Sequence, residues 1–359
     1  MTLNSPRPRI GLAMIVRNEA HIIERCLGSV RGLIDTWTIV DTGSTDNTVE
    51  LVKESLAGIP GNVHSRPWRD FSTNRNELLE LARPAAGYLL LLDADMTVRI
   101  TSADPLADLS EVAYDIMVEA GLQYRMPYLV SSDLDCSYVG RTHEYLSFTA
   151  TGATATPCDD IVITHIGDGG NRDTKLQRDL GLLESDAYAD PDNARTFFYL
   201  AQTREGLGDV PGALAAYRRR IELGGWEEEI FWSMYKCGML LEAAGDWPAA
   251  AQMYITAWEF RSHRVEPLVH LARGYRESGA HGAALMWAER AASIELPAGD
   301  RLFVEPWMYS WGVQLELAAN SWWCGDRERA QFIWRELLER TDIPADVHAT
   351  VSANLAQYS

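Results

Sequence analysis

The second half of the chain repeats one short pattern, and this repetition restricts the possible folds more than any other feature. Four segments begin with glycine and carry alanine five positions later; they start at Gly208, Gly245, Gly279 and Gly325. Three of them also place an aromatic residue nine positions after the glycine. Glycine permits a tight turn between two helices, and a small alanine lets the helices approach closely. The pattern predicts a series of helix pairs after about residue 189.

The spacing of the four segments indicates which kind of helical array this is. Their starts lie 37, 34 and 46 residues apart. These values approach the tetratricopeptide period of about 34 residues, with an insertion before the last repeat. Repeat arrays commonly bind a peptide or another subunit, and helical tails often dimerise, so a homodimer is an open alternative. Most of the tryptophans in this half are expected to fill interfaces between helices.

The first half alternates apolar strands with amphipathic helices. The runs at 10–16, 37–40 and 88–92 are short and apolar, and segments with helical spacing separate them. This order predicts an α/β domain with a mainly parallel, Rossmann-like sheet over residues 1–188, followed by the helical domain over 189–359. Ligands of such sheets bind beyond the carboxyl ends of the strands.

Charge and cysteine content narrow the function classes. The formal net charge of −19 repels phosphate backbones, which disfavours nucleic acids and anionic membrane surfaces as partners. The apolar run near the N-terminus is too short for a membrane span. The five cysteines are scattered and form no CxxC pair, so neither a disulfide framework nor a zinc site is indicated. A cytoplasmic location fits these features best.

Two acidic motifs follow predicted strands. DTGSTDNT occupies residues 41–48, and DAD occupies residues 93–95 after the run YLLLL. Two carboxylates two residues apart at a strand end are costly unless a positive group binds there. Their hard oxygen atoms suit Mg²⁺ or Mn²⁺ carrying a diphosphate. The alternative for each motif alone is a capped loop or a hydrated turn without function.

The first half resembles the family 2 glycosyltransferases, which have the GT-A fold. The matching residues are AMIVRNEA from Ala13, DTGSTDNT and LLLLDAD. The resemblance is strong over residues 9–100 and looser to about 185. The combination with a tetratricopeptide tail is similar to a bacterial subset of these enzymes.

The resemblance implies a donor site for a nucleoside-diphosphate sugar, with UDP as the expected nucleotide. The residues implied to contact the donor are Ala13, Ile15, Arg17, Asp41, Arg75, Asp93 and Ala94. In this assignment the backbone near Ala13 and the side chain of Asp41 hold the base. Asp95 ligates the metal directly, and Asp93 contacts the ribose or the metal shell.

The later residues supply candidates for the remaining roles. An inverting transferase needs a carboxylate that takes the acceptor's proton, and Glu144 in YVGRTHEYL is our first candidate. Asp133 and Asp135 are the alternatives, and Glu144 has the structural alternative of pairing with Arg141 or orienting His143. His165 resembles a late histidine that completes the metal site in many GT-A enzymes.

The segment after His165 suggests a cover for the donor. It is glycine-rich, and Arg172 and Lys175 near its end are candidates to fold over the diphosphate as a lid. The alternative is an exposed loop that leads into a helix.

The expected activity is therefore metal-dependent transfer of a hexose or N-acetylhexosamine, with inversion, to a hydroxyl or thiol. The acceptor is a peptide or a small natural product. One rival is an inactive transferase-like protein whose repeats act as a scaffold. A nucleotidyltransferase is a weaker rival, because no glycine-rich loop follows the first strand.

Overall fold

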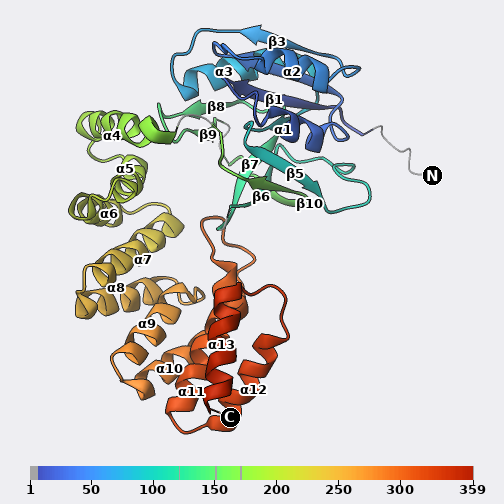
Figure 1. The fold of residues 1–359 in the computed structure, drawn as a ribbon. Helices are drawn as coiled ribbons and strands as arrows, with labels where there is room; N and C mark the ends of the chain where they lie inside the picture. The colour runs from blue at the N-terminus through green and yellow to red at the C-terminus, as the bar shows by residue number, and fades with distance from the viewer. Residues whose placement is uncertain (1–6, 121, 150–151, 170–171, 359) are drawn as a thin grey trace. The chain divides into compact units, whose positions relative to one another are not determined.

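A computed structural model describes residues 7–120, 122–149, 152–169 and 172–358; the side chains at 172–175 and 358 lie outside the described part. The chain divides into two compact units, Met1–Ser185 and Asp186–Ser359. The boundary predicted from the sequence, between residues 188 and 189, falls at the end of helix α4 (Arg172–Ala189). Figure 1 shows the elements of both units in chain order.

The first unit is built on one eight-stranded sheet with the order β3-β2-β1-β4-β7-β6-β10-β5. Its strands are β1 (Ile10–Val16), β2 (Thr36–Asp41), β3 (Gly61–Ser65), β4 (Tyr88–Leu91), β5 (Met96–Ile100), β6 (Ala113–Glu119), β7 (Gln123–Ser131) and β10 (Thr156–His165). The first four strands are parallel. Their crossovers contain α1 (Ile23–Val30), α2 (Thr48–Ser55) and α3 (Phe71–Ala82).

Alternate residues of β1 show how the helices cover this sheet. Ile10, Leu12 and Met14 are buried in one cluster with residues of α1 and α2. Ala13 and Ile15 point to the other face and join the cluster of α3. Because β1 is buried on both faces, its sequence is a continuous apolar run instead of an alternating one.

The second half of the sheet departs from the parallel pattern that the sequence predicted. β7 is antiparallel to both β4 and β6, and β10 is antiparallel to β5. The sheet is therefore mixed. A separate hairpin pairs β8 (Cys136–Val139) with β9 (Tyr145–Phe148). This reversal of chain direction decides which edge of the sheet each later side chain reaches.

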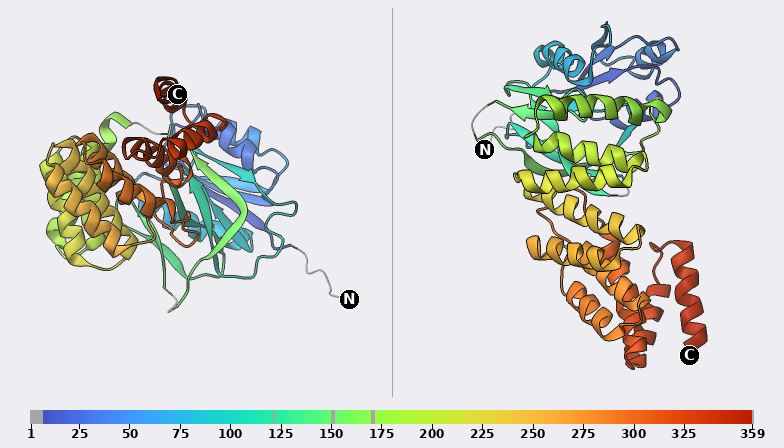
Figure 2. Two further views of the ribbon diagram at one scale, coloured as in Figure 1. Left: turned by 90° about the horizontal axis from the view of Figure 1, so that it is seen from below. Right: turned by 90° about the vertical axis from the view of Figure 1, so that its left-hand side faces the viewer.

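The second unit is a series of antiparallel helix pairs. The pairs are α5 (Ala194–Gly206) with α6 (Val210–Leu223), α7 (Glu227–Ala243) with α8 (Trp247–Phe260), α9 (Glu266–Glu277) with α10 (His281–Ala292), and α11 (Val313–Trp323) with α12 (Arg327–Leu338). The helix α13 (Ala345–Tyr358) follows. The right-hand view in Figure 2 shows successive pairs stacked one after another. A helical repeat region was predicted, and it is confirmed.

The repeated glycine lies in the turn of every pair. Gly208, Gly245, Gly279 and Gly325 all have positive φ, between 78° and 94°. In each turn the glycine N–H and the next N–H donate to carbonyls of the preceding helix in the 5→2 and 6→1 pattern. The alanines five positions later are fully buried: Ala213, Ala250, Ala284 and Ala330. The pattern therefore encodes both the turn and the close contact between helices.

An insertion separates the third and fourth pairs. It comprises residues 293–307 and leads into a π-helical turn, η2 (Met308–Gly312), before α11. It accounts for the longer last interval between the repeated segments. Among the described residues, no helix is long and apolar enough to cross a membrane.

Candidate active site

Two loops at the carboxyl edge of the sheet are bound to each other. Asn18, with a φ of 57°, follows β1, and its side-chain oxygen accepts a hydrogen bond from the Thr45 N–H at 2.7 Å. The Asn18 N–H in turn donates to the Ser44 hydroxyl. Asp46 accepts from the N–H of Ala20. The polar residues of DTGSTDNT therefore connect the loop after β2 to the loop after β1.

Asp41 is the last residue of β2, and it is buried at this edge. It lies in register with Val16, the last residue of β1. Its carboxylate accepts hydrogen bonds from the N–H groups of Gly43 and Ser44 at 3.1–3.3 Å. These contacts fix the side chain beside the sheet edge and order the turn that precedes α2.

Arg75 joins two of the predicted site carboxylates. It lies in α3, whose first turn is capped by Asp70. Its Nη2 donates to Asp93 at 2.7 Å and its Nε donates to Glu144 at 2.6 Å. The Arg75 side chain is 11% exposed, and its guanidinium lies over the ring of Tyr138. One buried cation therefore connects the strand end that carries DAD to the candidate base.

Burial and charge set the proton affinity of this cluster. Burial raises the pKa of Glu144 above the usual range for glutamate, and Arg75 offsets only part of that effect. Burial alone would lower the pKa of Arg75, but Asp93 and Glu144 keep its pKa well above the ordinary value. A carboxylate with a raised pKa, held in place by a permanent cation, suits proton transfer near neutral pH.

The β8–β9 hairpin carries Glu144 to the sheet edge. The side chain of Asn76, next to Arg75 on α3, donates to the Tyr138 carbonyl and accepts from the Tyr138 N–H. These two hydrogen bonds hold β8 against α3. Glu144 immediately precedes β9, so the hairpin and α3 together position it.

Asp95 and His165 face each other at the same edge. The distance from His165 Nε2 to Asp95 Oδ2 is 3.2 Å, and the two side chains are 34% and 18% exposed. His165 ends β10, which pairs antiparallel with β5 directly after DAD. The Ile166 N–H donates to the Asp95 carbonyl, so the antiparallel pairing of β10 with β5 continues as far as DAD. Asp168 further on forms a two-bond ion pair with Arg25 of α1.

The donor atoms of this pair fit a divalent cation. A carboxylate oxygen and an imidazole nitrogen are ligands that Mn²⁺ accepts, and a diphosphate and water supply further oxygens. Asp93 differs, because Arg75 already neutralises one of its oxygens. Within the described part of the chain, no group of three or more His, Cys, Asp or Glu residues is arranged to hold a metal. Among the described residues, Asp95 and His165 are the candidate ligands at this edge.

Comparison with known proteins decides the family of this domain. Residues 12–118 match the family model for glycosyl transferase family 2. These residues form a domain of that family. The matched range contains Asp41, Arg75, Asp93 and Asp95, whereas Glu144 and His165 lie outside it.

Relatives add information on the whole chain. A TPR repeat-containing protein of Synechococcus elongatus is 27% identical over 324 residues, which cover 82% of this chain and 77% of the relative. That alignment is longer than either unit, so both units have counterparts in one relative. The glycosyltransferase SunS of Bacillus subtilis strain 168, which derives from the SPbeta prophage, is 23% identical over 213 residues. The alignment covers 55% of this chain and 50% of SunS.

Solved structures similar to the chain include a tetratricopeptide repeat protein from Parabacteroides merdae. It is 15% identical, covers 51% of this chain and 66% of its own length, and superposes with a TM-score of 0.40.

The other residues predicted for the donor site differ in their exposure to solvent. Ala13 and Ile15 are buried, and the Ala13 carbonyl accepts from the Leu92 N–H. Ala94 is also buried between the two carboxylates of DAD. Arg17 is exposed at the edge, directly after β1. The side chains of Arg172 and Lys175, predicted as a lid, lie outside the described residues.

The structure does not bring Asp133 and Asp135 to this edge. β7 runs antiparallel to β4, and Ser131 pairs with Tyr88, the first residue of β4. The loop after β7 therefore lies at the amino end of β4, opposite to DAD. Asp133 and Asp135 were the alternatives to Glu144 as the base, and the reversed direction of β7 places them at the edge opposite to Asp93 and Asp95.

Some site residues have only weak signals in the sequence. Asn76 belongs to no motif quoted above, yet together with Tyr138 it holds the hairpin that carries Glu144. The partner of Glu144 was also missed, because the expected partners were Arg141 and His143. Arg75 lies 69 positions away in sequence, and only the packing of the hairpin on α3 brings it into contact. The Cys26 thiol donates to the Asp93 carbonyl, and burial raises its pKa to about 12, so it stays protonated near neutral pH.

Proposed function

We propose that the protein is an inverting glycosyltransferase that moves a hexose or N-acetylhexosamine from a nucleoside-diphosphate sugar to a hydroxyl or thiol. The arrangement of Arg75 carries this proposal: it links Asp93, at the predicted donor edge, to Glu144, the predicted base. The match to glycosyl transferase family 2 and the similarity to SunS support glycosyl transfer in general. UDP is the proposed nucleotide, and the acceptor is a peptide or a small natural product.

The chain's own residues have separable roles in this proposal. Asp41 and the backbone beyond β1 hold the nucleotide, and Asp93 contacts the ribose. Asp95 and His165 hold Mn²⁺ or Mg²⁺, which when bound neutralises charge on the diphosphate. Arg17 lies at the same edge and supplies a further positive charge.

The transfer is a single displacement at the anomeric carbon. The acceptor oxygen or sulfur forms a bond to that carbon while the bond to the diphosphate oxygen breaks, and the diphosphate leaves with the electron pair. Glu144 takes the proton of the acceptor. Arg75 keeps Glu144 oriented and ionised before that step.

The proposal also includes a cytoplasmic location and a homodimer. All five cysteines are free thiols, and four of them are buried. Free thiols are typical of a reducing compartment, which favours the cytoplasm. A homodimer through the helical repeats stays a prediction.

Glu144→Gln tests the assignment of the base. Removing a general base typically costs about 10²–10⁴-fold in rate, so kcat should fall by that factor while KM for the donor changes little. In the wild type, kcat/KM should decline on the acid side as Glu144 is protonated, above the ordinary glutamate pKa of about 4.3. The variant should lack this acid limb. The measurement is the rate of sugar transfer between about pH 4 and pH 9, a range that begins near the ordinary pKa of glutamate.

A matched control comes from the same helix as Arg75. Glu80→Gln removes an exposed carboxylate on α3 and should keep both kcat and the acid limb. Near-normal turnover by Glu144→Gln would show that another group takes the proton.

A further inference from the structure

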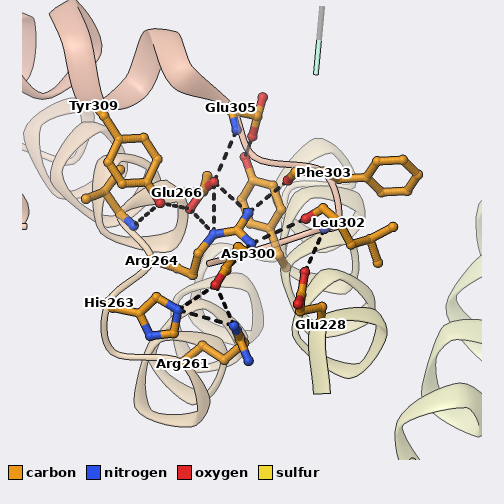
Figure 3. Close-up of polar contacts among 12 residues, drawn as sticks. Glu228, Arg261, His263, Arg264, Glu266, Asp300, Leu302, Phe303, Glu305 and Tyr309 are labelled. Carbon is orange, nitrogen blue, oxygen red and sulfur yellow. Dashed lines mark hydrogen bonds and ion pairs between the residues drawn. The ribbon is translucent and has the colours of Figure 1, made fainter. Parts of the chain in front are cut away.

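Residues 300–305 of the insertion lie against the first helices of the first three pairs. Their contacts come from α5, from α7, from the loop between α8 and α9, and from the start of α9. The preceding part of the insertion differs, because Glu295 and Leu296 are exposed. We call the side chains of α5, α7 and α9 that contact residues 300–305, together with Arg264, the receptor face. Figure 3 shows polar contacts between this face and the segment.

The receptor face binds the main chain of this segment. Glu228 Oε2 accepts hydrogen bonds from two successive N–H groups, of Arg301 at 2.7 Å and of Leu302 at 2.6 Å. Arg264 donates to the carbonyl of Phe303 at 2.8 Å. Glu266 accepts from the Glu305 N–H at 3.3 Å. Side chains therefore satisfy main-chain groups along the segment, as they do when a protein binds a separate extended peptide.

Two side chains of the segment anchor it. Phe303 packs against Phe198 of α5, with stacked rings 6.3 Å apart, and against Trp232 of α7 at 5.0 Å. Two positions later, Glu305 accepts a hydrogen bond from the Tyr235 hydroxyl at 2.7 Å. The anchors are an aromatic ring and a carboxylate with one residue between them.

The backbone of Phe303 is held in a conformation that it would not adopt by itself. Its φ is 45°, a region that bulky residues rarely occupy and that persists where surrounding contacts impose it. The carbonyl contact with Arg264 and the ring contacts with Phe198 and Trp232 are those contacts.

Arg264 pairs with one carboxylate of the receptor face and with one carboxylate of the segment. Arg264 and Glu266 are both fully buried and pair with each other at 2.7 Å. Arg264 also pairs with Asp300, which the insertion supplies, at 2.9 Å. Figure 3 shows Arg264 between these two carboxylates. A buried cation is stabilised by each carboxylate that pairs with it, so the contact with Asp300 favours the occupied state of the receptor face.

We propose that the receptor face is a binding site for an extended peptide, and that residues 300–305 of the same chain fill it as a tethered ligand. The site takes a segment with an aromatic residue followed two positions later by a carboxylate. A tether of this length gives an effective concentration on the order of millimolar, so a free peptide at micromolar concentration does not displace it. If the chain transfers sugar to a peptide, as proposed above, that acceptor binds elsewhere.

A binding experiment on the full chain tests this proposal. In one variant, residues 299–306 are replaced by a glycine-serine segment of the same length. The probe is a fluorescein-labelled peptide with the sequence of residues 298–307. The replaced variant should bind it saturably, at least tenfold more tightly than the wild type, and the same peptide with Phe303→Ala should bind at least tenfold more weakly. Glu295→Gln, in the exposed part of the insertion, should behave like the wild type.

Two results would overturn the proposal. One is equal binding of the peptide to the wild type and the replaced variant; the other is a folded variant, with wild-type helical circular dichroism, that binds no peptide. If the variant fails to fold, hydrogen exchange of the wild type decides instead. The amides of Arg301, Leu302 and Glu305 should exchange at least 100-fold more slowly than those of Glu295 and Leu296, and equal rates would contradict the proposal. Neither readout needs sugar transfer, so the two proposals can fail separately.

Discussion

Replacing Asp95 with asparagine is expected to lower kcat/KM for sugar transfer by about 10²–10³-fold and to remove most of its dependence on added Mn²⁺. Asp95 is the carboxylate of DAD that faces His165, at 3.2 Å, whereas Asp93 is paired with Arg75. The amide of asparagine keeps the shape of the side chain but not its negative charge, so the loss measures the charge. The measurement is initial transfer rate against Mn²⁺ concentration.

Two controls make this result specific. Asp104→Asn removes an exposed carboxylate in the loop after β5 and should leave the rate and the metal response unchanged. Thermal unfolding of Asp95→Asn without ligands should match the wild type within a few degrees, because asparagine keeps the size of this partly buried side chain and creates no cavity. If Asp95→Asn kept its full response to Mn²⁺, the metal would have to bind elsewhere.

Replacing Arg264 with methionine is expected to destabilise the helical unit by about 3–5 kcal/mol. Methionine fills much of the volume but leaves Glu266, which is fully buried, and Asp300 without this cation. At roughly 2–4 °C per kcal/mol for a unit of this size, the Tm should fall by about 10 °C. Thermal unfolding followed by circular dichroism measures the change.

The pH dependence separates charge from packing in this variant. Although burial opposes ionisation, Arg264 and His263 keep the pKa of Asp300 below its ordinary value. The stability that Asp300 contributes is therefore present above about pH 4 and is lost as the pH falls through the lower pKa of the folded state. In Arg264→Met, Asp300 loses one of the cations that stabilise its charged form, so protonation of Asp300 costs the variant less stability than it costs the wild type. The difference in Tm should therefore shrink towards pH 3, roughly one unit below the ordinary aspartate pKa.

An exposed ion pair is the matched control for Arg264. Arg329 pairs with Glu289 at 2.6 Å, but the two side chains are 38% and 49% exposed. Arg329→Ala should cost no more than about 1 kcal/mol. An equal loss for the two arginine variants would mean that burial of the Arg264 network contributes nothing special to the stability of the unit.

Local sequence patterns predicted the parts of the fold that local interactions determine. The glycine of each repeat predicted a turn, and all four glycines have positive φ in the same hydrogen-bonded turn. The apolar run at 10–16 predicted a strand buried on both faces, and β1 has those bounds. Turn and strand signals of this kind depend on residues within a few positions of each other.

Contacts between distant segments could not be predicted in the same way. The ion pair of Arg75 with Glu144 depends on how the β8–β9 hairpin packs on α3. The position of Asp133 depends on the direction of β7, which the alternation of residues within a strand does not reveal. The insertion was visible only as a longer interval between repeats, and its sequence did not indicate that Phe303 and Glu305 occupy the receptor face.

Thermal unfolding with UDP, GDP, CDP and dTDP, each with and without Mn²⁺, tests the central claim most directly. A nucleotide at about 100 times its Kd stabilises the folded protein by about 2.7 kcal/mol, which corresponds to a rise of several degrees in Tm. We predict such a rise with one nucleotide, UDP first, only when Mn²⁺ is present, and its loss in Asp95→Asn. No shift with any of the four nucleotides would contradict the donor site and favour a protein that acts through its helical repeats alone.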